Sequence, residues 1–388
     1  MKIGIDIRNI GKHRTGDEVV FFNLTKNLAE IDRKNTYLLF SDITDPQILN
    51  EISGRLGIAK RKNFQIIPLA VFGIKPLHKF VWNFWTLPRY LHKNPIDKYL
   101  TQYITPFFIS KKIKIITIFH DISFNFFPQF IKFFDKLFLK ILVPITLHRA
   151  DKIVTVSEFT ADEIAHYYKI DSKKITWIHN AVGDEFLTAV KNKLTKEETK
   201  KIRAHYNLPD KFILYLGTLQ PRKNIPTLIE AYAKLPPEIR QDIKLVLAGA
   251  RGYNFDAKID VMLKKYSLEK EVPFLGYIPD EDKAYIFKLA HIFCFPSFYE
   301  GFGIPILESF AAKTPVIASD IPPHREIAEL CALFFNPNDS AELSKKLQLL
   351  YLEPRDREDL VKLGEIQVQK FSWRNTAEKI LGIIEDSR

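Results

Sequence analysis

The chain has 388 residues, of which 46% are hydrophobic, enough for packed cores and, at roughly 100–200 residues per domain, for about two domains. Its two cysteines, Cys294 and Cys331, are too few for a disulfide framework or a cysteine-based metal site, so a reducing cytoplasm suits it. The first residues mix charged and apolar side chains, unlike a secretory signal, and no run approaches the ~18–20 apolar residues of a membrane span. We therefore expect a soluble cytoplasmic protein that at most lies on a membrane surface.

The net charge of +11 is concentrated in the first half of the chain. Residues 1–150 hold 23 Lys and Arg against 11 Asp and Glu, whereas the remaining residues hold 34 against 35. Between Lys60 and Lys114 there are eleven basic residues and one acid, Asp97. This excess predicts an anionic partner, such as a membrane surface, a phosphate-bearing acceptor or a nucleic acid, but it is equally typical of a solvated basic surface.

Short apolar runs alternate with helical patterns in two series along the chain. In the first series we predict strands at Lys2–Ile7, Tyr37–Ser41, Phe64–Pro68, Lys114–Phe119 and Lys152–Val156, and helices that include Val19–Ile31 and Ala161–Tyr168. In the second we predict strands at Phe212–Gly217, Lys244–Ala248, Val272–Leu275, Ile292–Phe295 and Pro315–Ala318, and helices at Ile225–Leu235, Asp280–Ala290 and Ile304–Ala312. Such alternation is typical of parallel sheets covered on both faces, so we expect two doubly wound α/β domains. The charged stretch Lys191–Asp210 is the expected boundary.

The strongest binding-site pattern is FPSFYEGFGIPILESFAAKTPVIASD, residues 295–320. A strand, a loop with Gly301 and Gly303, and a helix follow one another there. Glycines let the backbone approach a ligand, and the start of a helix favours an anion. Glu300 and Glu308 could grip the hydroxyls of a hexose and a ribose, because an ionised carboxylate accepts two or more hydrogen bonds. The alternative is that Glu300 caps the helix and Glu308 is solvated.

This segment closely resembles the Glu-x7-Glu region of glycosyltransferase family 4, and the resemblance extends over nearly the whole chain. FILYLGTLQPRKNIPTLIEAYAKL, Phe212–Leu235, is similar to the strand, loop and helix that open the family's donor domain. LVLAGA, FLGYIPDEDKAYIFKLA, VIASDIPPHREI and FSWRNTAEKI match in order, as do TIFHDISF and IVTVSEFTADEI in the first half. The resemblance implies the α/β fold called GT-B, with two Rossmann-like domains facing a cleft. Residues 1–190 would form the acceptor side, with 372–388 packing back on them, and residues 191–371 would bind a nucleotide sugar.

The resemblance also implies roles for residues of the second domain. Glu300 would contact the transferred sugar and Glu308 the ribose. Arg222 and Lys223, unless they are ordinary surface charges, would clamp the diphosphate; negative charge grows there as it leaves, so fixed cations stabilise the transition state. The remaining donor-binding positions, which act mainly through the backbone, would be Gly301, Phe302, Gly303, Ile304, Gly217, Thr218, Gly276, Tyr277 and Ile278. Many family members carry Gly-Arg where this chain has Gly217-Thr218, and Arg222 would take the place of that cation.

In the first domain, His120 ends a predicted strand. A lone histidine there is often structural, but the resemblance implies that it hydrogen-bonds the transferred sugar, with Asp121 orienting it or capping the next turn. Gly16 would approach the donor phosphates; because Asp17 and Glu18 would repel phosphate, its loop could instead bind the acceptor. The sequence has no cluster of His, Cys, Asp and Glu with metal-ligand spacing, so we expect a reaction without metal or cofactor, in which the cations replace a divalent ion.

Two aromatic and basic stretches, Lys75–Asn94 and Phe124–Val143, resemble interfacial amphipathic helices, although Phe and Leu at helical spacing are also typical of a core. On the first interpretation the protein lies on the inner face of the cell membrane and acts on a lipid-linked glycan. We predict retaining transfer of a hexose from a nucleotide sugar to a glycan or lipid-linked glycan hydroxyl. GDP-mannose is favoured, because GTLQPRKN resembles a subgroup that contains mannosyltransferases, and a UDP-sugar is the alternative.

Two further hypotheses stay open from the sequence. One is a nucleotide-sugar epimerase or hydrolase with the same fold. The other is a non-enzymatic protein whose basic half binds nucleic acid; since we recognise no nucleic-acid-binding motif, we expect no nucleic acid as a partner.

Overall fold

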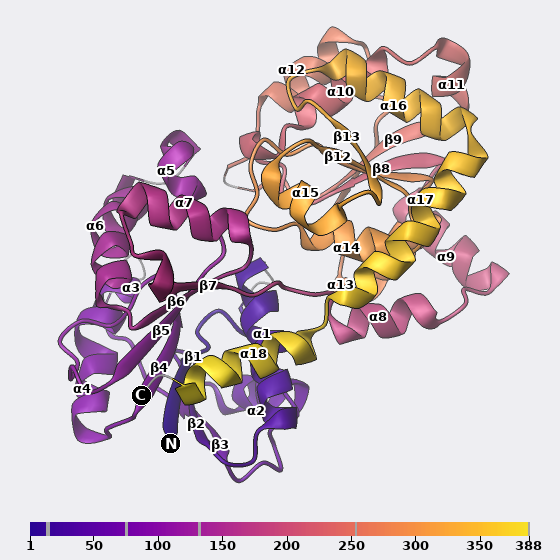
Figure 1. Cartoon of the computed structure of the whole chain (residues 1–388). Helices are drawn as coiled ribbons and strands as arrows, with labels where there is room; N and C mark the ends of the chain where they lie inside the picture. The colour runs from indigo at the N-terminus through magenta and orange to yellow at the C-terminus, as the bar shows by residue number, and fades with distance from the viewer. Residues whose placement is uncertain (13–15, 74–76, 131–132, 253, 387–388) are drawn as a thin grey trace. The chain divides into compact units, whose positions relative to one another are not determined.

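The computed structural model of the chain describes residues 1–388 except 13–15, 74–76, 131–132, 253 and 387–388. The chain divides into two compact units, each built on one parallel sheet (Figure 1). The first unit comprises Met1–Phe126, Lys132–Asn180 and Ser372–Arg388. The second comprises Phe127–Ile131 and Ala181–Phe371.

The sheet of the first unit has seven strands in the order β3-β2-β1-β4-β5-β6-β7. Its strands are β1 (Lys2–Asp6), β2 (Thr36–Ser41), β3 (Phe64–Pro68), β4 (Lys98–Gln102), β5 (Lys114–Phe119), β6 (Lys152–Thr155) and β7 (Ile175–Trp177). Its helices are α1 (Gly16–Ile31), α2 (Pro46–Arg55), α3 (His78–Val81), α4 (Leu87–Lys93), α5 (Ser123–Phe126), α6 (Phe133–Arg149), α7 (Glu158–Tyr168) and α18 (Trp373–Asp386), and a π-helical segment, Trp82–Thr86, joins α3 to α4.

The sheet of the second unit has six strands in the order β10-β9-β8-β11-β12-β13. They are β8 (Phe212–Leu216), β9 (Lys244–Ala248), β10 (Phe274–Gly276), β11 (Ile292–Phe295), β12 (Val316–Ser319) and β13 (Ala332–Phe335). The helices are α8 (Asp184–Lys191), α9 (Lys196–Tyr206), α10 (Ile225–Ala233), α11 (Pro237–Asp242), α12 (Lys258–Lys265), α13 (Asp280–Leu289), α14 (Ile304–Ala311), α15 (Pro322–Ala328), α16 (Ser340–Leu352) and α17 (Pro354–Gln367).

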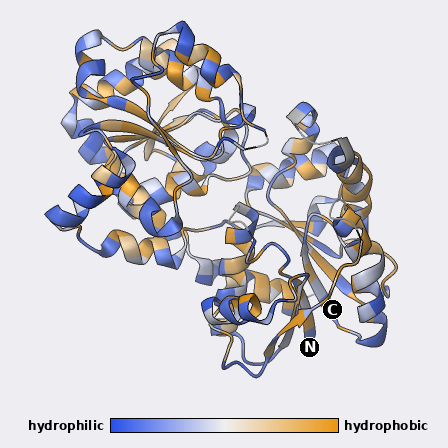
Figure 2. Cartoon of the chain, turned by 180° about the vertical axis from the view of Figure 1, so that it is seen from behind, coloured by the Kyte–Doolittle hydropathy of each residue, from blue (hydrophilic) through white to orange (hydrophobic). Residues whose placement is uncertain are grey.

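The strands are apolar and the helices are amphipathic, as Figure 2 shows by the orange strands enclosed within helices that carry blue residues. Strand residues such as Ile5 and Val246 are fully buried, because helices cover both faces of a parallel sheet. In each sheet the strand order reverses once, between β1 and β4 and between β8 and β11. Such a reversal opens a crevice beyond the carboxyl ends of the two strands, where ligands of doubly wound sheets bind.

The predicted strands all occur within two residues of their expected ends, but three strands were missed: β4, β7 and β13. β4 begins with Lys98, which argues against a central strand, yet that lysine is 4% exposed and its ammonium donates to the carbonyl of Ile384 in α18. β7 is only three residues long. Short strands such as β7, and strands that begin with a charged residue such as β4, are hard to predict from local sequence, because their pairing partners lie far away in the chain.

The last helix of the chain, α18, packs against α1 within the first unit. Trp373, Ile380 and Ile384 of α18 are at most 1% exposed. The hydroxyl of Thr376 donates a 2.7 Å hydrogen bond to the carbonyl of His179. The core of the first unit therefore includes residues from both ends of the sequence.

Candidate active site

The loops after β8 and β11 lie side by side at the strand-order reversal of the second sheet, because these strands are neighbours. The amide of Phe298 donates to the carbonyl of Arg222 at 2.8 Å, and the guanidinium of Arg222 donates to the carbonyl of Tyr299 at 3.2 Å. Asn224 adds a 3.0 Å bond from its side-chain amide to the carbonyl of Pro296. These bonds hold two loops that are distant in sequence in one arrangement.

Glu300 is the centre of a buried charge cluster formed by these loops. Arg222 Nη1 lies 3.0 Å from Glu300 Oε2, and both Lys223 Nζ and the Ser297 hydroxyl donate to Oε1, the latter at 2.6 Å. Glu300 and Lys223 are 8% and 7% exposed. Burial acts to raise the pKa of Glu300, but the attraction of Lys223 and then of Arg222 outweighs it and lowers the pKa to about 2. Glu300 does not cap α14, whose N-cap residue is Gly303.

A buried histidine lies beside this cluster. His324 is fully buried, and its Nδ1 lies 3.1 Å from the hydroxyl and 3.0 Å from the carbonyl oxygen of Ser319. Its ring centroid is 5.2 Å from that of Phe295, over which Lys223 Nζ lies at 5.0 Å. Burial lowers the pKa of His324 to about 4, against a smaller opposing effect of Glu300. The imidazole is therefore neutral near pH 7.

Glu308, one turn inside α14, has a different partner. Lys283 Nζ of α13 lies 2.5 Å from Glu308 Oε1. The second carboxylate oxygen is buried and makes no hydrogen bond within the described part of the chain. Glu308 is 5% exposed, so it is not the solvated residue of the alternative interpretation. Lys283 was not among the predicted site residues; the only signal for it in the sequence is a basic residue early in a helix that follows the segment 276–278.

The glycine-containing loop before α14 packs tightly. Gly303 has φ +140°, which residues with a side chain rarely adopt, and a Cβ there would lie 2.8 Å from Ile327 Cδ1, so the position favours glycine. Gly301 and Phe302 are buried, and Phe302 is only 4% exposed, so its ring belongs to the core. At this loop a ligand would meet backbone groups and the positive end of the helix that begins at Ile304.

The other positions predicted for the donor lie at the neighbouring strand ends. The amide of Gly217, after β8, donates to Ala248 at 3.0 Å, and the amide of Gly249 donates to Gly276 at 2.8 Å. Thr218 follows Gly217 in the same loop and accepts a hydrogen bond from Tyr215. After β10, Tyr277 is 61% exposed whereas Ile278 is 7% exposed. These positions share one edge of the sheet with the loop of Arg222.

The remaining two predicted site residues, His120 and Gly16, belong to the first unit. His120 follows β5, and its Nε2 lies 3.7 Å from Asp17 Oδ1 of α1. Asp121 accepts from the amide and hydroxyl of Ser123 at 2.9 and 2.8 Å, so it caps the next turn. Gly16 is the first residue of α1, and a side chain there would meet no atom within 4 Å.

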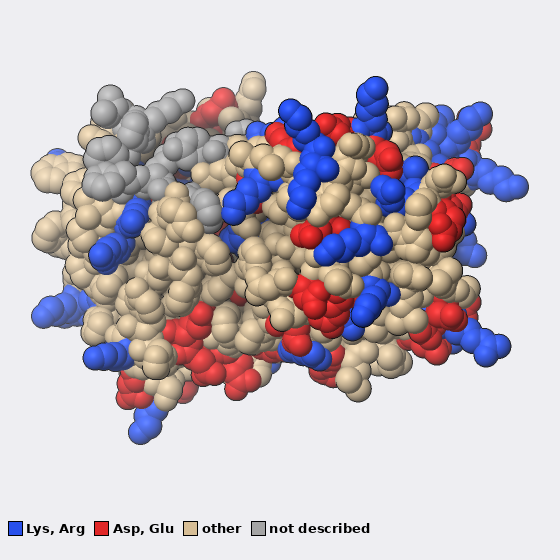
Figure 3. All heavy atoms as spheres, turned by 90° about the horizontal axis from the view of Figure 1, so that it is seen from above, with Lys and Arg blue, Asp and Glu red and all other residues tan. Residues whose placement is uncertain are grey.

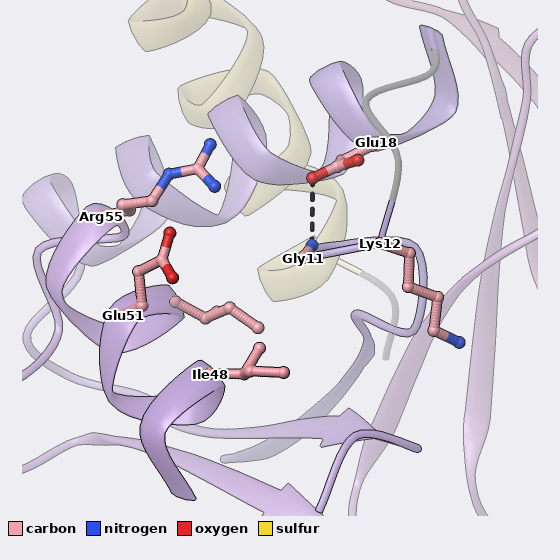
Figure 4. Close-up of a pocket in the computed structure, with 7 residues that line it drawn as sticks. Gly11, Lys12, Glu18, Ile48, Glu51 and Arg55 are labelled. Carbon is pink, nitrogen blue, oxygen red and sulfur yellow. Dashed lines mark hydrogen bonds between the residues drawn. The ribbon is translucent and has the colours of Figure 1, made fainter. Parts of the chain in front are cut away.

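A pocket of about 170 Å³ is lined by residues of the loop after β1 and of the helices α1 and α2 (Figure 4). Glu18 is 3% exposed; one carboxylate oxygen accepts from the amide of Gly11 at 3.0 Å, and the other is buried without a hydrogen bond in the described residues. The guanidinium of Arg55 lies 5.0 Å above the ring of Phe22. The residues that line the pocket are Gly11, Lys12, Glu18, Ile48, Glu51, Ile52 and Arg55.

The two aromatic and basic stretches of the first unit are partly core and partly surface. Trp82, Leu87 and Leu91 are buried, as are Leu142 and Val143. Large apolar side chains nevertheless remain exposed in and beside these stretches; we call them the apolar surface of the first unit, Phe80, Trp85, Phe108, Leu137, Ile141 and Ile145, which are 45–74% exposed. Residues 75–76 and 131–132 of the predicted stretches lie outside the described residues.

Charge on the molecular surface is mixed where Figure 3 shows it. Lys and Arg lie beside Asp and Glu on that face, and wide areas carry neither. Among the helices described, none has the length and apolar character needed to span a bilayer.

Comparison with solved structures defines the class to which this fold belongs. Anabaena Alr3699/HepE, solved in complex with UDP and glucose, matches with a TM-score of 0.73 over 99% of both chains at 16% identity. The glycosyltransferase WaaG matches with a TM-score of 0.71 over 100% of both chains at 14% identity. The fold is therefore that of the GT-B glycosyltransferases, as predicted.

Comparison of sequences identifies the family. A model described as Glycosyltransferase Family 4 matches residues 15–186, and one described as Glycosyl transferases group 1 matches residues 196–367. O-antigen chain mannosyltransferase B of Escherichia coli is 32% identical over 67% of this chain and 67% of its own length. O-antigen chain mannosyltransferase RfbU of Salmonella typhimurium is 28% identical over 81% of each. The chain belongs to glycosyltransferase family 4 and is a glycosyltransferase.

One relative is much longer than the segment it shares with this chain. The serotype-specific mannosyltransferase WbdA of Escherichia coli is 33% identical over 59% of this chain, but the match spans 28% of that protein.

Proposed function

We propose that this glycosyltransferase transfers mannose from GDP-mannose to a glycan or lipid-linked glycan hydroxyl, with retention at the anomeric carbon. The observation that carries the proposal is the cluster of Arg222, Lys223 and Glu300 at the strand-order reversal of the second sheet. It puts two cations and a carboxylate within one hydrogen-bonded group, as a ligand with a diphosphate and a hydroxyl-rich ring requires. Glu308 would hold the ribose of the same donor.

The cluster suggests how the donor is recognised and activated. As the diphosphate binds, Arg222 and Lys223 would turn from Glu300 to the phosphate oxygens, and the sugar hydroxyls would donate to Glu300 in their place. As the bond to the anomeric carbon breaks, negative charge grows on the diphosphate, and the two fixed cations stabilise it more than they stabilise the ground state. For retention, the departing phosphate would take the proton of the acceptor hydroxyl on the same face of the sugar.

Mannose is supported by the relatives, two of which are O-antigen chain mannosyltransferases by name. A UDP-sugar is the competing donor, because the Anabaena structure of similar fold holds UDP and glucose. We expect product from GDP-mannose and not from UDP-glucose when the purified chain is given a lipid-extract acceptor and the products are weighed by mass spectrometry. Product from UDP-glucose alone would remove the mannosyl proposal. Sugar released or epimerised without acceptor would favour the hydrolase or epimerase alternative.

We further propose that the cations make a divalent metal unnecessary for turnover. In the described residues, no group of three or more His, Cys, Asp and Glu could hold a metal ion. Turnover with GDP-mannose should be the same with magnesium and with excess EDTA. Proton NMR of the product should show the anomeric configuration of the donor, and the opposite configuration would contradict retention.

On the acceptor side, we assign the pocket around Glu18 to one saccharide unit of the acceptor. The buried carboxylate oxygen of Glu18 needs a hydrogen-bond donor, which a hydroxyl of the acceptor sugar supplies. Ile48 and Ile52 offer an aliphatic wall to the sugar ring.

We assign the apolar surface of the first unit to an anionic membrane surface. Exposed aromatic and aliphatic side chains there lie among Lys79, Lys136 and Lys140, and such mixtures bind the headgroup region of anionic bilayers.

A further inference from the structure

Lys283 and Glu308 form a buried ion pair between α13 and α14. Their side chains are 18% and 7% exposed, and Lys283 Nζ lies 2.5 Å from Glu308 Oε1. The other oxygen of Glu308 is buried and accepts no hydrogen bond within the described ranges. α13 begins at Asp280, shortly after the segment 276–278, in which Tyr277 is exposed and Ile278 is buried. The pair therefore joins the first turn of α13 to α14, one turn beyond its start at Ile304.

The two side chains have opposite hydrogen-bonding capacities. An ammonium donates only, an ionised carboxylate accepts only, and a hydroxyl does both. Two neighbouring hydroxyls match such a pair. One can donate to the unused oxygen of Glu308, and the second can donate to the other oxygen while it accepts from Lys283. A carboxylate alone would accept from both hydroxyls but would offer their oxygens nothing.

We propose that Lys283 is a specificity-determining residue that, together with Glu308, reads the 2′,3′-diol of the donor's ribose. The assignment rests on the proposed function, which puts the ribose at Glu308. Lys283 would have two effects. It fixes the orientation of the Glu308 carboxylate, and its ammonium donates a hydrogen bond to a hydroxyl oxygen of the intact diol. A nucleotide that lacks one of the two hydroxyls should leave a buried polar group of the protein without its hydrogen-bond partner. Sites of this kind bind such an analogue much more weakly.

A purely structural role is the alternative, in which the pair only joins two helices. Loss of Lys283 would then lower the stability of the chain, because it leaves Glu308 buried without a counter-charge. Nucleotide affinity could change too, but ribose and deoxyribose would be affected alike. The ratio of the two affinities is therefore the informative quantity.

The experiment titrates the full chain by calorimetry with GDP and 2′-deoxy-GDP. Lys283→Met should reduce the preference for GDP over 2′-deoxy-GDP about tenfold, and Lys283→Arg, which keeps a donor, should retain most of it. Lys345→Met, at an exposed lysine of α16, removes the same charge elsewhere and should retain the full preference. Combined with Glu308→Gln, Lys283→Met should lower the preference further, but by less than the tenfold that it causes alone, as expected for residues that act as a pair.

An unchanged preference in Lys283→Met, with only a lower melting temperature, overturns the proposal and leaves the proposed function standing. If Glu308→Gln does not weaken GDP binding, the donor site itself is misplaced and both proposals fail. Should Lys283→Met not fold, the double variant with Glu308→Gln decides. A lower preference for GDP over 2′-deoxy-GDP in the double variant than in Glu308→Gln supports the proposal, and an equal preference overturns it.

Discussion

Arg222 Nη1 lies 3.0 Å from Glu300 Oε2, so the cation assigned to the diphosphate and the carboxylate assigned to the sugar are bonded to each other. A donor that carries both groups can replace both halves of this bond at once. A nucleoside diphosphate without its sugar can take the cations but leaves a buried carboxylate with fewer partners, which is costly. This relationship favours the intact donor over the spent nucleotide and would assist release of the nucleotide after transfer.

The first prediction concerns this cluster. We expect Glu300→Gln and Lys223→Ala each to lower turnover at least ~100-fold, because each removes a contact to charge or hydroxyls in the transition state. Turnover should be measured at saturating donor, with circular dichroism to confirm folding. Glu329→Gln, at an exposed ion pair with Lys370, is the matched control and should keep normal turnover. Near-normal turnover in both cluster variants contradicts the site.

The second prediction concerns His120 beside Asp17. If the imidazole hydrogen-bonds the transferred sugar, His120→Ala should lower kcat roughly 100-fold, which is the lower end of the range for a side chain positioned at the reacting groups. The affinity for the nucleoside diphosphate should stay unchanged. His166→Ala, at an exposed position of α7, serves as the control. Equal kcat in the two variants would assign His120 a structural role.

The third prediction is a pH dependence of stability that arises from His324. Its pKa is about 4 in the folded chain and about 6.5 when unfolded. Between these values the unfolded chain binds more protons, so stability should fall as the pH drops from about 6.5 to 4, by on the order of 3 kcal/mol. Denaturant unfolding at pH 7 and 4.5 should show a smaller loss in His324→Gln than in the unaltered chain. Exposed His205→Gln should behave as the unaltered chain, and equal losses in all three proteins refute the assignment.

The fourth prediction tests the apolar surface of the first unit. Trp85→Asp and Ile141→Asp replace exposed side chains, so they should not affect folding. Each should reduce sedimentation with phosphatidylglycerol vesicles several-fold, whereas Leu330→Asp, at an 83% exposed position of the second unit, should not. Binding that is indifferent to all three substitutions argues against this surface as the membrane contact.

The fifth prediction tests the pocket around Glu18. Ile48 is 38% exposed at its edge, so Ile48→Trp would fill the pocket without disturbing a packed core. We expect the KM for acceptor to rise about tenfold, equal to the loss of one or two good contacts, with the KM for donor unchanged. Val261→Trp, at an exposed position of α12, is the control. An unchanged acceptor KM would remove the pocket from the acceptor site.

The apolar periodicity was sufficient to predict most strands and the two α/β units, because these depend on local patterns. The partners of charged residues could not be predicted in this way. Glu300 and Arg222 are 78 residues apart, and their contact depends on β8 and β11 being neighbours in the sheet. Lys283 was missed for the same reason, since its pairing with Glu308 requires α13 and α14 to pack together. Lys98 concealed β4 because its charge is satisfied by α18, at the far end of the sequence.

The packing of α18 on α1 has a consequence for biosynthesis. A ribosome makes β1 and α1 first and α18 only after the whole second unit, so the surface that buries Trp373 and Ile384 stays uncovered until residues 373–386 have been made. A polypeptide truncated near residue 371 would leave this surface open to aggregation or proteolysis. The first unit therefore completes its fold only after the second unit has been synthesised.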